Sequence, residues 1–412
     1  MKLFHTTALG LALALGATAM VATQPVAAKS SGSSKPAHYS DAIQKNLPVA
    51  QKAIDAGQTD AAKTAIAAAE AGIQTPDDKY AVGGLTLNLG IKSNDTALES
   101  KGINLMIDSG QAPADQLPKL LGNQAQLAIQ ARDYNTAEAA YTKLVQLDPN
   151  NGDNVLTLAE IKDQNKKPAE ALQLIQQAVA AKKAAGQQVP QDIYKRGFAI
   201  AYNAKNAAAV ASLSSALVQA YPSPDNWRDT LQVYRELNNP DVQANLDLYR
   251  LQRAAKALKG ERDFYEYTNS ALDRGLPGEA AAVIDEGTAA NMIGGPSKAL
   301  TEVKSLSSAK VAADKASLAS SATRASSASN GKVALNTADA YLGYGDYAKA
   351  AELYKLALQK GGVDADTVNT RLGIALARSG QKAAALQAFG AVNGPVRKGI
   401  AQYWIIWTNQ QA

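Results

Sequence analysis

Small and aromatic residues recur along this chain with helical spacing, most clearly between residues 337 and 392. Three pairs of like positions there are each 35 residues apart: Gly345 and Gly380, Ala350 and Ala385, and Tyr354 and Phe389. Within the first copy, Tyr354 and Ala357 follow Ala350 at i+4 and i+7, which places all three on one helix face. The pattern predicts one helix–turn–helix unit written twice.

The residue types fit that geometry. Gly345 can adopt the left-handed conformation that ends a helix, and Ala350 is small where a second helix would cross close to the first. A single helix pair cannot bury its apolar face alone, so neighbouring pairs must stack on it. We therefore predict an all-α fold, a right-handed α-α superhelix (solenoid) of antiparallel helix pairs with a concave and a convex surface.

The second copy resembles the tetratricopeptide repeat family through Leu372-Gly373, Gly380, Ala385 and Phe389. The spacing is also close to the period of about 34 residues of that family. The resemblance implies a superhelix that serves as a platform for protein partners.

Similar units occur along most of the chain. Ala137 and Ala171 are 34 residues apart, as are Tyr141 and Ile175. Counting units predicts about nine or ten helix pairs in one extended solenoid covering residues 39–412. The clearest repeats are 119–149, 153–181, 191–221, 262–292, 333–361 and 367–393.

Three stretches fit the period less simply. Between Gly83 and Gly110 the pattern predicts irregular helices. Residues 297–330 are rich in Ala, Ser and Lys, and their place in the period predicts one more pair centred near Lys315, with a mobile loop as the alternative. Residues 396–407 hold two of the three Trp, which favours a C-terminal capping helix over a face for docking or dimerisation.

The N-terminus has the features of an export signal. Lys2 precedes a mostly apolar run from Ala8 to Ala22, and small residues at 26–28 offer a cleavage site. We expect a signal peptide at 1–28, a flexible lead-in at 29–38, and a periplasmic or secreted protein with no transmembrane anchor after cleavage. Because the chain has no cysteine, the lipid-anchored export route is closed.

The net charge of the chain indicates little about its function. The net charge of +5 is a mild excess over 412 residues, and no basic run with interleaved aromatics indicates nucleic acid as a partner. Weak attraction to acidic polysaccharide in a cell envelope is left open.

The residues for most catalytic sites are missing. The only two histidines are His5, inside the expected signal peptide, and His38 at the edge of the lead-in. A His/Cys zinc cluster therefore cannot form, and a Ser–His–Asp system is nearly excluded. No cofactor motif is present. Glu99-Ser100 is faintly similar to the catalytic Glu-Ser of soluble lytic transglycosylases, but the downstream elements of that family are absent. We predict a protein that is not an enzyme.

In the tetratricopeptide repeat family, the first helix of each pair lines the concave surface. Counting back from the small Ala of each second helix places nine candidate partner-binding residues there: Asn123, Gln126, Gln130, Lys195, Tyr202, Asn336, Asp339, Arg371 and Arg378. Amide and cationic groups along one groove suit a peptide backbone, a carboxylate or an acidic segment. Asn336 and Arg371 also match two positions of the carboxylate clamp found in some members.

The resulting hypothesis is a non-enzymatic scaffold in the bacterial cell envelope. It would hold protein or peptide partners in its concave surface, in a setting such as outer-membrane or polysaccharide-export assembly. The alternative is a periplasmic protein that binds peptidoglycan or acidic polysaccharide.

Overall fold

The computed structural model describes residues 38–293 and 298–411. The predicted signal peptide and all of the lead-in except His38 lie outside the described residues. Twenty α-helices and no strand are found in the described ranges, which confirms the all-α prediction. The chain separates into two compact units that meet within one helix, at residues 174 and 175. Each unit is described by itself.

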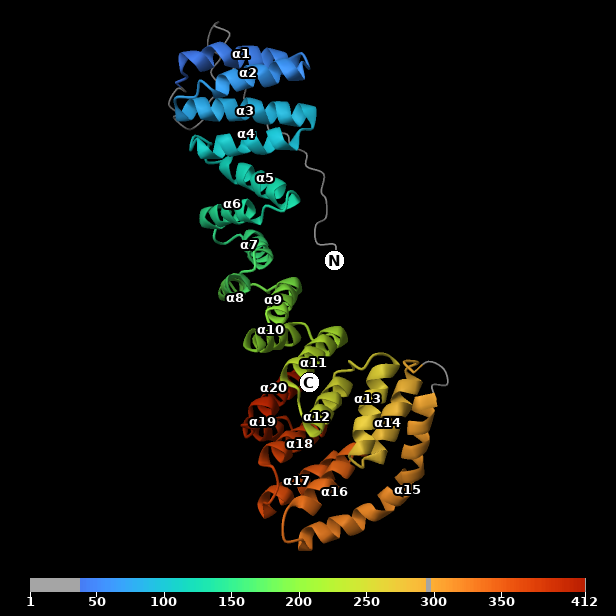
Figure 1. Ribbon diagram of the computed structural model, residues 1–412. Helices are drawn as coiled ribbons and strands as arrows, with labels where there is room; N and C mark the ends of the chain where they lie inside the picture. The colour runs from blue at the N-terminus through green and yellow to red at the C-terminus, as the bar shows by residue number, and fades with distance from the viewer. Residues whose placement is uncertain (1–37, 294–297, 412) are drawn as a thin grey trace. The chain divides into compact units, whose positions relative to one another are not determined.

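The N-terminal unit consists of seven helices and the first part of an eighth, with successive helices packed in antiparallel pairs (Figure 1). Its helices are α1 (Asp41–Asp55), α2 (Thr59–Glu70), α3 (Pro76–Ser93), α4 (Thr96–Asp108), α5 (Leu117–Gln130), α6 (Tyr134–Leu147), α7 (Gly152–Gln164) and α8 (Pro168–Ala184).

The C-terminal unit contains the rest of α8 and the twelve helices that follow. They are α9 (Gln191–Asn203), α10 (Ala207–Ala220), α11 (Pro224–Asn238), α12 (Val242–Ala254), α13 (Gly260–Asp273), α14 (Pro277–Ala289), α15 (Lys298–Ser327), α16 (Lys332–Gly343), α17 (Tyr347–Lys360), α18 (Ala365–Arg378), α19 (Lys382–Gly390) and α20 (Pro395–Gln410).

The turns within the last two pairs form at the glycines that the sequence indicated. Gly345 and Gly380 have φ angles of +80° and +76°, the left-handed region in which glycine carries no steric penalty. After the first of these turns, the carboxylate of Asp346 accepts the backbone N–H of Lys349 and caps α17. Each α16–α17 and α18–α19 hairpin is therefore specified by its own local sequence.

The predicted irregularity between Gly83 and Gly110 is wrong. α3 and α4 are regular helices, and the glycines lie where the two backbones approach closely. A Cβ atom on Gly102 would lie 2.4 Å from the backbone N of Leu87 and 2.7 Å from the carbonyl oxygen of Gly83. One on Gly90 would lie 2.6 Å from the backbone N of Glu99. These glycines permit close helix packing and do not interrupt the helices.

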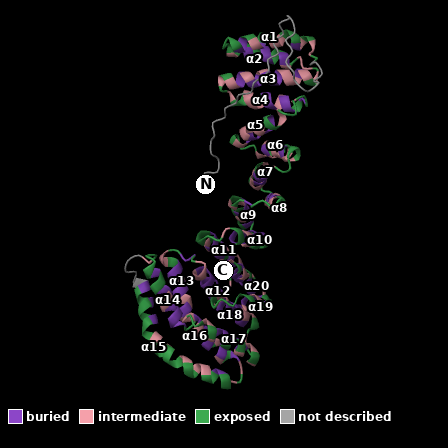
Figure 2. Cartoon of the chain, turned by 180° about the vertical axis from the view of Figure 1, so that it is seen from behind, coloured by how far each residue is buried: buried purple, intermediate pink, exposed green. Residues whose placement is uncertain are grey.

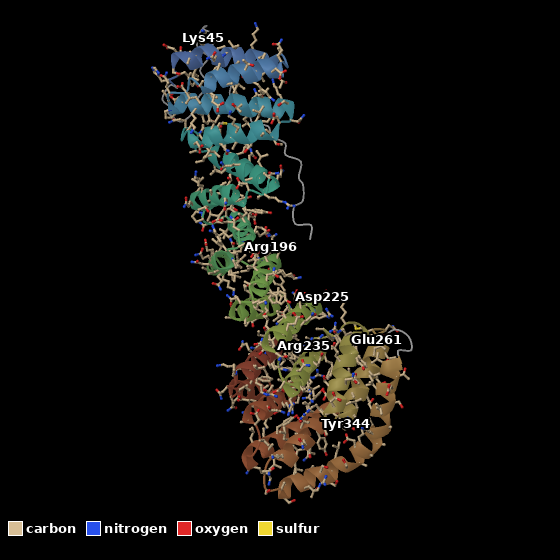
Figure 3. All side chains as sticks on the ribbon, in the orientation of Figure 1. Lys45, Arg196, Asp225, Arg235, Glu261 and Tyr344 are labelled. Carbon is tan, nitrogen blue, oxygen red and sulfur yellow. The ribbon has the colours of Figure 1, made fainter. Side chains whose placement is uncertain are left out.

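The predicted helix pair centred near Lys315 is also wrong, because α15 is a single helix of 30 residues. The stretch contains no Gly or Pro between Lys298 and Ser327 that could form a turn. Its outer side is exposed, as the green colour in Figure 2 shows. Tyr344, labelled in Figure 3, supports its middle by donating a 2.7 Å hydrogen bond to the Asp314 carboxylate.

Polar contacts in the N-terminal unit join neighbouring repeats. Lys101 and Glu70 form an ion pair of 2.6 Å across 31 residues, and the Tyr80 hydroxyl donates to Gln116 across 36 residues. Such contacts between residues about one repeat apart are what a solenoid requires.

The C-terminal unit departs from that rule, because α20 packs on α10 and α12 as well as on α18 and α19 (Figure 1). The hydroxyls of Tyr403 and Ser214 lie 2.8 Å apart, although they are separated by 189 residues. The Gln410 amide donates to the carbonyl oxygen of Val218 at 2.7 Å. The unit therefore closes on itself, with its C-terminal helices against helices that begin almost 200 residues earlier.

The aromatic side chains of α20 fill this closure. The ring of Trp404 stacks on Phe389 of α19, so α20 does cover the last repeat as a capping helix would. Tyr403 makes edge-to-face contacts with Trp227 and Tyr234 of α11 on the other side. Both sets of rings are buried, which gives α20 two packed faces. In the described ranges no helix is long and apolar enough to span a bilayer.

Candidate protein-binding surface

The clearest candidate surface lies on α5 of the N-terminal unit. Asn123, Gln126 and Gln130 are spaced i, i+3 and i+7, so they share one face of the helix. Asn123 and Gln126 are half-buried and Gln130 is exposed. The Asn123 amide nitrogen is buried and has no hydrogen-bond acceptor. The three predicted residues therefore form a polar row that includes one unsatisfied donor.

The same row continues on α7. Thr157, Glu160 and Gln164 each lie 34 residues after the corresponding α5 residue. Their spacing puts them on one face of α7, with Asp153 one turn before Thr157. We call these positions of α5 and α7 the first-helix face of the N-terminal unit. It offers side-chain amides, a hydroxyl and carboxylates to a partner.

Two further predicted residues are exposed on α9 of the C-terminal unit. Lys195 is exposed, and Tyr202 is 39% exposed with its hydroxyl donating to Glu236 of α11 at 2.8 Å. That hydrogen bond raises the pKa of the Tyr202 phenol above its ordinary value. Tyr202 is thus accessible but already engaged with a neighbouring repeat.

Asn336 of α16 and Arg378 of α18 are also exposed. The Arg378 guanidinium lies 5.2 Å from the centre of the Tyr347 ring and donates to its hydroxyl at 3.0 Å. Arg378 therefore braces two repeats, as Tyr202 does.

The structure corrects the placement of Asp339 and Arg371. Arg371 is 1% exposed and Asp339 is 8% exposed, so neither lines an open groove. The two side chains form an ion pair of 2.7 Å with each other. With Arg371 buried, the pairing of Asn336 and Arg371 in a carboxylate clamp has no structural basis.

Arg371 belongs to a buried charge cluster centred on Asp247 of α12, which is fully buried. The Asp247 carboxylate pairs with Arg250 at 2.8 Å, Arg397 at 3.0 Å and Arg371 at 3.2 Å. These arginines come from α12, α20 and α18. The indole N–H of Trp404 also donates to the backbone carbonyl of Asp247. One residue thus joins three helices that are far apart in the sequence.

Further buried groups complete the cluster. Arg250 makes a bidentate contact with Glu279 of α14, at 2.7 and 2.8 Å. The hydroxyls of Tyr267 and Tyr354 donate to Glu279 and Asp339, respectively. Every carboxylate of the cluster therefore accepts hydrogen bonds from charged or phenolic donors, as buried charges require.

The electrostatics keep these carboxylates ionised. Burial opposes the ionisation of Asp247, yet Arg371, Arg250 and Arg397 hold the pKa of its carboxyl below the ordinary value. Burial acts in the same way on Glu279, and Arg250 lowers its pKa. The carboxylates of Asp247 and Glu279 are therefore held in their charged forms.

Sequence reasoning missed Asp247 and Arg397 because the ion pairs of Asp247 with Arg371 and Arg397 span 124 and 150 residues. One local signal was available. Leu246, Leu248 and Leu251 flank Asp247 and Arg250 in the sequence, and charged residues that such a helix buries must find partners within the protein.

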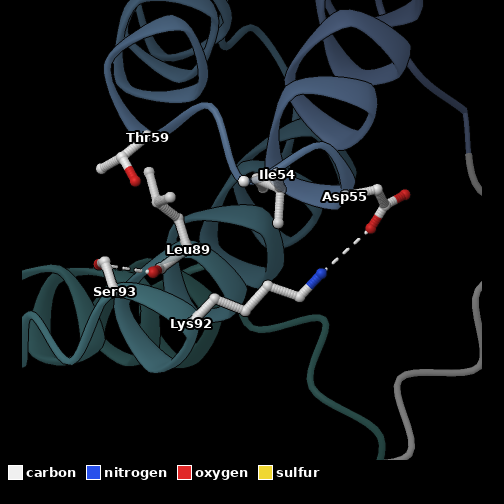
Figure 4. Close-up of a pocket in the computed structure, with 7 residues that line it drawn as sticks. Ile54, Asp55, Thr59, Leu89, Lys92 and Ser93 are labelled. Atoms are coloured by element: carbon white, nitrogen blue, oxygen red, sulfur yellow. Dashed lines mark hydrogen bonds and ion pairs between the residues drawn. The ribbon is translucent and has the colours of Figure 1, made fainter.

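Two surface pockets in the described part of the chain do not add to the candidate surface. One of about 330 Å³ lies beside the turn between α1 and α2, where Lys92 and Asp55 form an ion pair of 3.2 Å (Figure 4). A second, of about 420 Å³, lies along α6 and reaches Lys167. Neither pocket contains any of the nine predicted residues. Across the described residues, no group of His, Asp and Glu is arranged to hold a metal ion.

Comparisons with known proteins bear on the fold. No curated protein sequence matches the chain. Three solved structures are similar at low identity. A Naa15/Naa10 complex bound to HypK-THB has 16% identity and a TM-score of 0.31, over 86% of this chain and 64% of that one. The chain thus spans less than two thirds of that protein's length.

The other two similar structures are bacterial. PilF of Pseudomonas aeruginosa has 14% identity and a TM-score of 0.22, over 44% of this chain and 93% of that one. A tetratricopeptide repeat protein from Parabacteroides merdae ATCC 43184 has 11% identity and a TM-score of 0.24, over 82% of this chain and all of that one.

The sequence family described as tetratricopeptide repeat matches residues 128–188. That range begins at the end of α5 and includes α6, α7 and α8, where Ala137 and Ala171 repeat at 34 residues. Stacked antiparallel helix pairs with this period are the architecture of the family. Residues 128–188 are therefore similar to the tetratricopeptide repeat family in both sequence and helix arrangement.

Proposed function

We propose that this protein is a non-enzymatic scaffold that binds protein partners through the first-helix face of its N-terminal unit. Tetratricopeptide repeats typically support protein–protein contacts. The observation that carries the proposal is the Asn123 amide nitrogen, which is buried on α5 without an acceptor. Leaving such a donor unsatisfied costs roughly 1–3 kcal/mol. An acceptor supplied by a bound partner would recover this energy if the half-buried Asn123 side chain turns outward on binding.

The chemistry of the face fits an extended peptide. Gln126 and Gln130 each carry an amide that both donates and accepts, and so can bond to a peptide backbone. Because α5 and α7 present equivalent positions one repeat apart, a chain laid across both helices would meet polar side chains on each. In the C-terminal unit, by contrast, the groove candidates Asp339 and Arg371 are buried in the cluster around Asp247.

For the cellular setting we propose the bacterial envelope, with export directed by residues 1–28 and a role in outer-membrane or polysaccharide-export assembly. The apolar run and small-residue cleavage site support export. N-terminal sequencing of protein recovered from the periplasm should show Lys29 as the first residue. Protein recovered from the cytoplasm with Met1 intact would contradict export.

The test of binding is Asn123→Ala in the mature chain. Peptides selected from a random displayed library on the unchanged protein should bind the variant about tenfold more weakly, because a hydrogen bond is lost. Isothermal titration calorimetry measures the dissociation constants. Gln146→Ala, an exposed amide on α6, is the matched control and should bind like the unchanged protein. Equal binding by all three proteins would show that the site lies elsewhere.

A further inference from the structure

The first-helix face of the N-terminal unit carries more acidic than basic side chains. On α7, Asp153 and Glu160 lie on the same face as Thr157, and Asp163 lies one turn beyond Glu160. On α5, Lys119 lies one turn before Asn123 and is the cation of this row. The row therefore contains three carboxylates and one ammonium group.

Two of these carboxylates have no ion-pair partner. Neither Asp153 nor Asp163 approaches a Lys or Arg within ion-pair distance in the described ranges, although many other acids of this unit do. Asp163 is half-buried, and its burial raises the pKa of the carboxyl above the ordinary value despite nearby Lys166. A carboxylate held partly out of water with no cation in direct contact would gain from a cation supplied by a ligand.

The lysine of α7 does not neutralise this face. The Lys162 ammonium is turned toward α6 and α8, where it pairs with Glu138 at 2.9 Å and Glu170 at 2.6 Å. Lys167 also pairs with Glu138, and these donors hold the pKa of that carboxyl at about 2 against the effect of burial. Lys162 and Lys167 are thus used in joining repeats, and Asp153 and Asp163 remain without an ion pair.

The wider charge distribution has the same sign. Residues 38–174 carry 12 Lys and Arg against 17 Asp and Glu, a net charge of −5. Residues 175–412 carry 27 against 20, a net charge of +7. The N-terminal unit is therefore acidic, although the whole chain has a mild positive charge. At long range, an acidic unit attracts positively charged ligands.

We infer that the partner segment recognised by the first-helix face is basic, an extended stretch containing Lys or Arg. The unsatisfied Asn123 donor would take a backbone carbonyl of that segment, while Asp153 and Asp163 would take its cationic side chains in charge-assisted hydrogen bonds. The inference rests on the proposed function and names its partner class. It reverses the sequence expectation of an acidic segment, which followed from the cationic groove candidates, and of an acidic polymer, which followed from the net positive charge of the whole chain.

Three fluorescent peptides test the charge of the partner, in which serine alternates with lysine, glutamine or glutamate. Fluorescence anisotropy with the mature chain should show the lysine peptide binding about fivefold or more tightly than the glutamine peptide, and the glutamate peptide binding most weakly. This order should fade when the ionic strength rises to about 1 M, where charges are screened over about 3 Å.

Paired variants locate the effect. Asp153→Asn with Asp163→Asn should abolish the preference for lysine and leave binding of the glutamine peptide unchanged. Asp41→Asn with Asp60→Asn removes the same charge from the first turns of α1 and α2 and should keep the preference. A preference that both pairs reduce equally would mean diffuse attraction by the whole unit and would overturn the inference.

Other outcomes separate the inference from the proposed function. Tight binding of the glutamine or glutamate peptide that Asn123→Ala weakens would overturn the basic partner and leave the scaffold standing. Binding of the lysine peptide that Asn123→Ala does not change would overturn both. Salt-sensitive self-association without peptide, seen by sedimentation velocity, would assign the acidic face to the basic unit of a second copy and would also overturn the inference.

Discussion

Asp247→Ala is expected to lower the free energy of unfolding of the C-terminal unit by about 3–5 kcal/mol, the cost of removing one partner from a buried ion pair. The reason is the number of charges that Asp247 compensates. Arg250, Arg371 and Arg397 would remain buried, and Glu279 and Asp339 would be the only carboxylates left to them in the cluster. The variant would also separate α12 from α18 and α20, because these arginines carry the contact.

Urea unfolding followed by tryptophan fluorescence measures this effect in the right part of the molecule. All three tryptophans, Trp227, Trp404 and Trp407, lie in the C-terminal unit, on α11 and α20. Glu286→Ala is the control, since its ion pair with Arg253 is partly exposed and worth at most about 1 kcal/mol. A loss below 1 kcal/mol for Asp247→Ala would mean that the cluster does not hold the unit closed.

Gly102→Ala is expected to lower the stability of the N-terminal unit by about 1–3 kcal/mol, the usual cost of overpacking. The new methyl group would meet backbone atoms of Leu87 and Gly83 at less than 3 Å, and backbone cannot move aside as a flexible side chain can. α3 and α4 would have to separate along their length. Thermal unfolding followed by circular dichroism measures the loss.

Gly122→Ala provides a control of opposite sign. Gly122 lies inside α5 with no atom near its missing Cβ, so alanine should stabilise the helix by about 0.5–1 kcal/mol. Neither change should alter tryptophan fluorescence, because the N-terminal unit contains no tryptophan. Similar effects from both substitutions would contradict the role of Gly102 in close packing.

The features that the sequence predicted correctly are local. The α16–α17 and α18–α19 hairpins depend on Gly345 and Gly380 at their turns and on small Ala350 and Ala385 at their crossings. All of these contacts lie within about 35 residues, the distance over which a repeat pattern carries information.

Features that depend on distant contacts were not predicted. Arg371 occupies a position that lines the groove in an open superhelix, but here it meets Asp247 from 124 residues earlier. A repeat pattern in the sequence does not indicate a contact over this distance. α15 shows a different limit, because the repeat period predicted a turn near Lys315 where the local sequence has no residue to make one.

The candidate surface shows the same difference between local and distant contacts. Position counting placed Asn123, Gln126 and Gln130 correctly on one helix face, because α5 and its neighbours are packed as ordinary repeats. The same counting failed for Asp339 and Arg371, because the C-terminal unit closes around them. Exposure of a groove position thus depends on whether the superhelix stays open.

The central claim, that the C-terminal unit closes on itself, is tested most directly by a distance between α12 and α20. The chain has no cysteine, so Val242→Cys and Gln402→Cys can each carry a spin label at an exposed site without other changes. Pulsed electron spin resonance should give one narrow, short distance, since packed helix axes are about 8–10 Å apart. A long distance, as expected if the intervening helices were stacked in an open superhelix, would contradict the account.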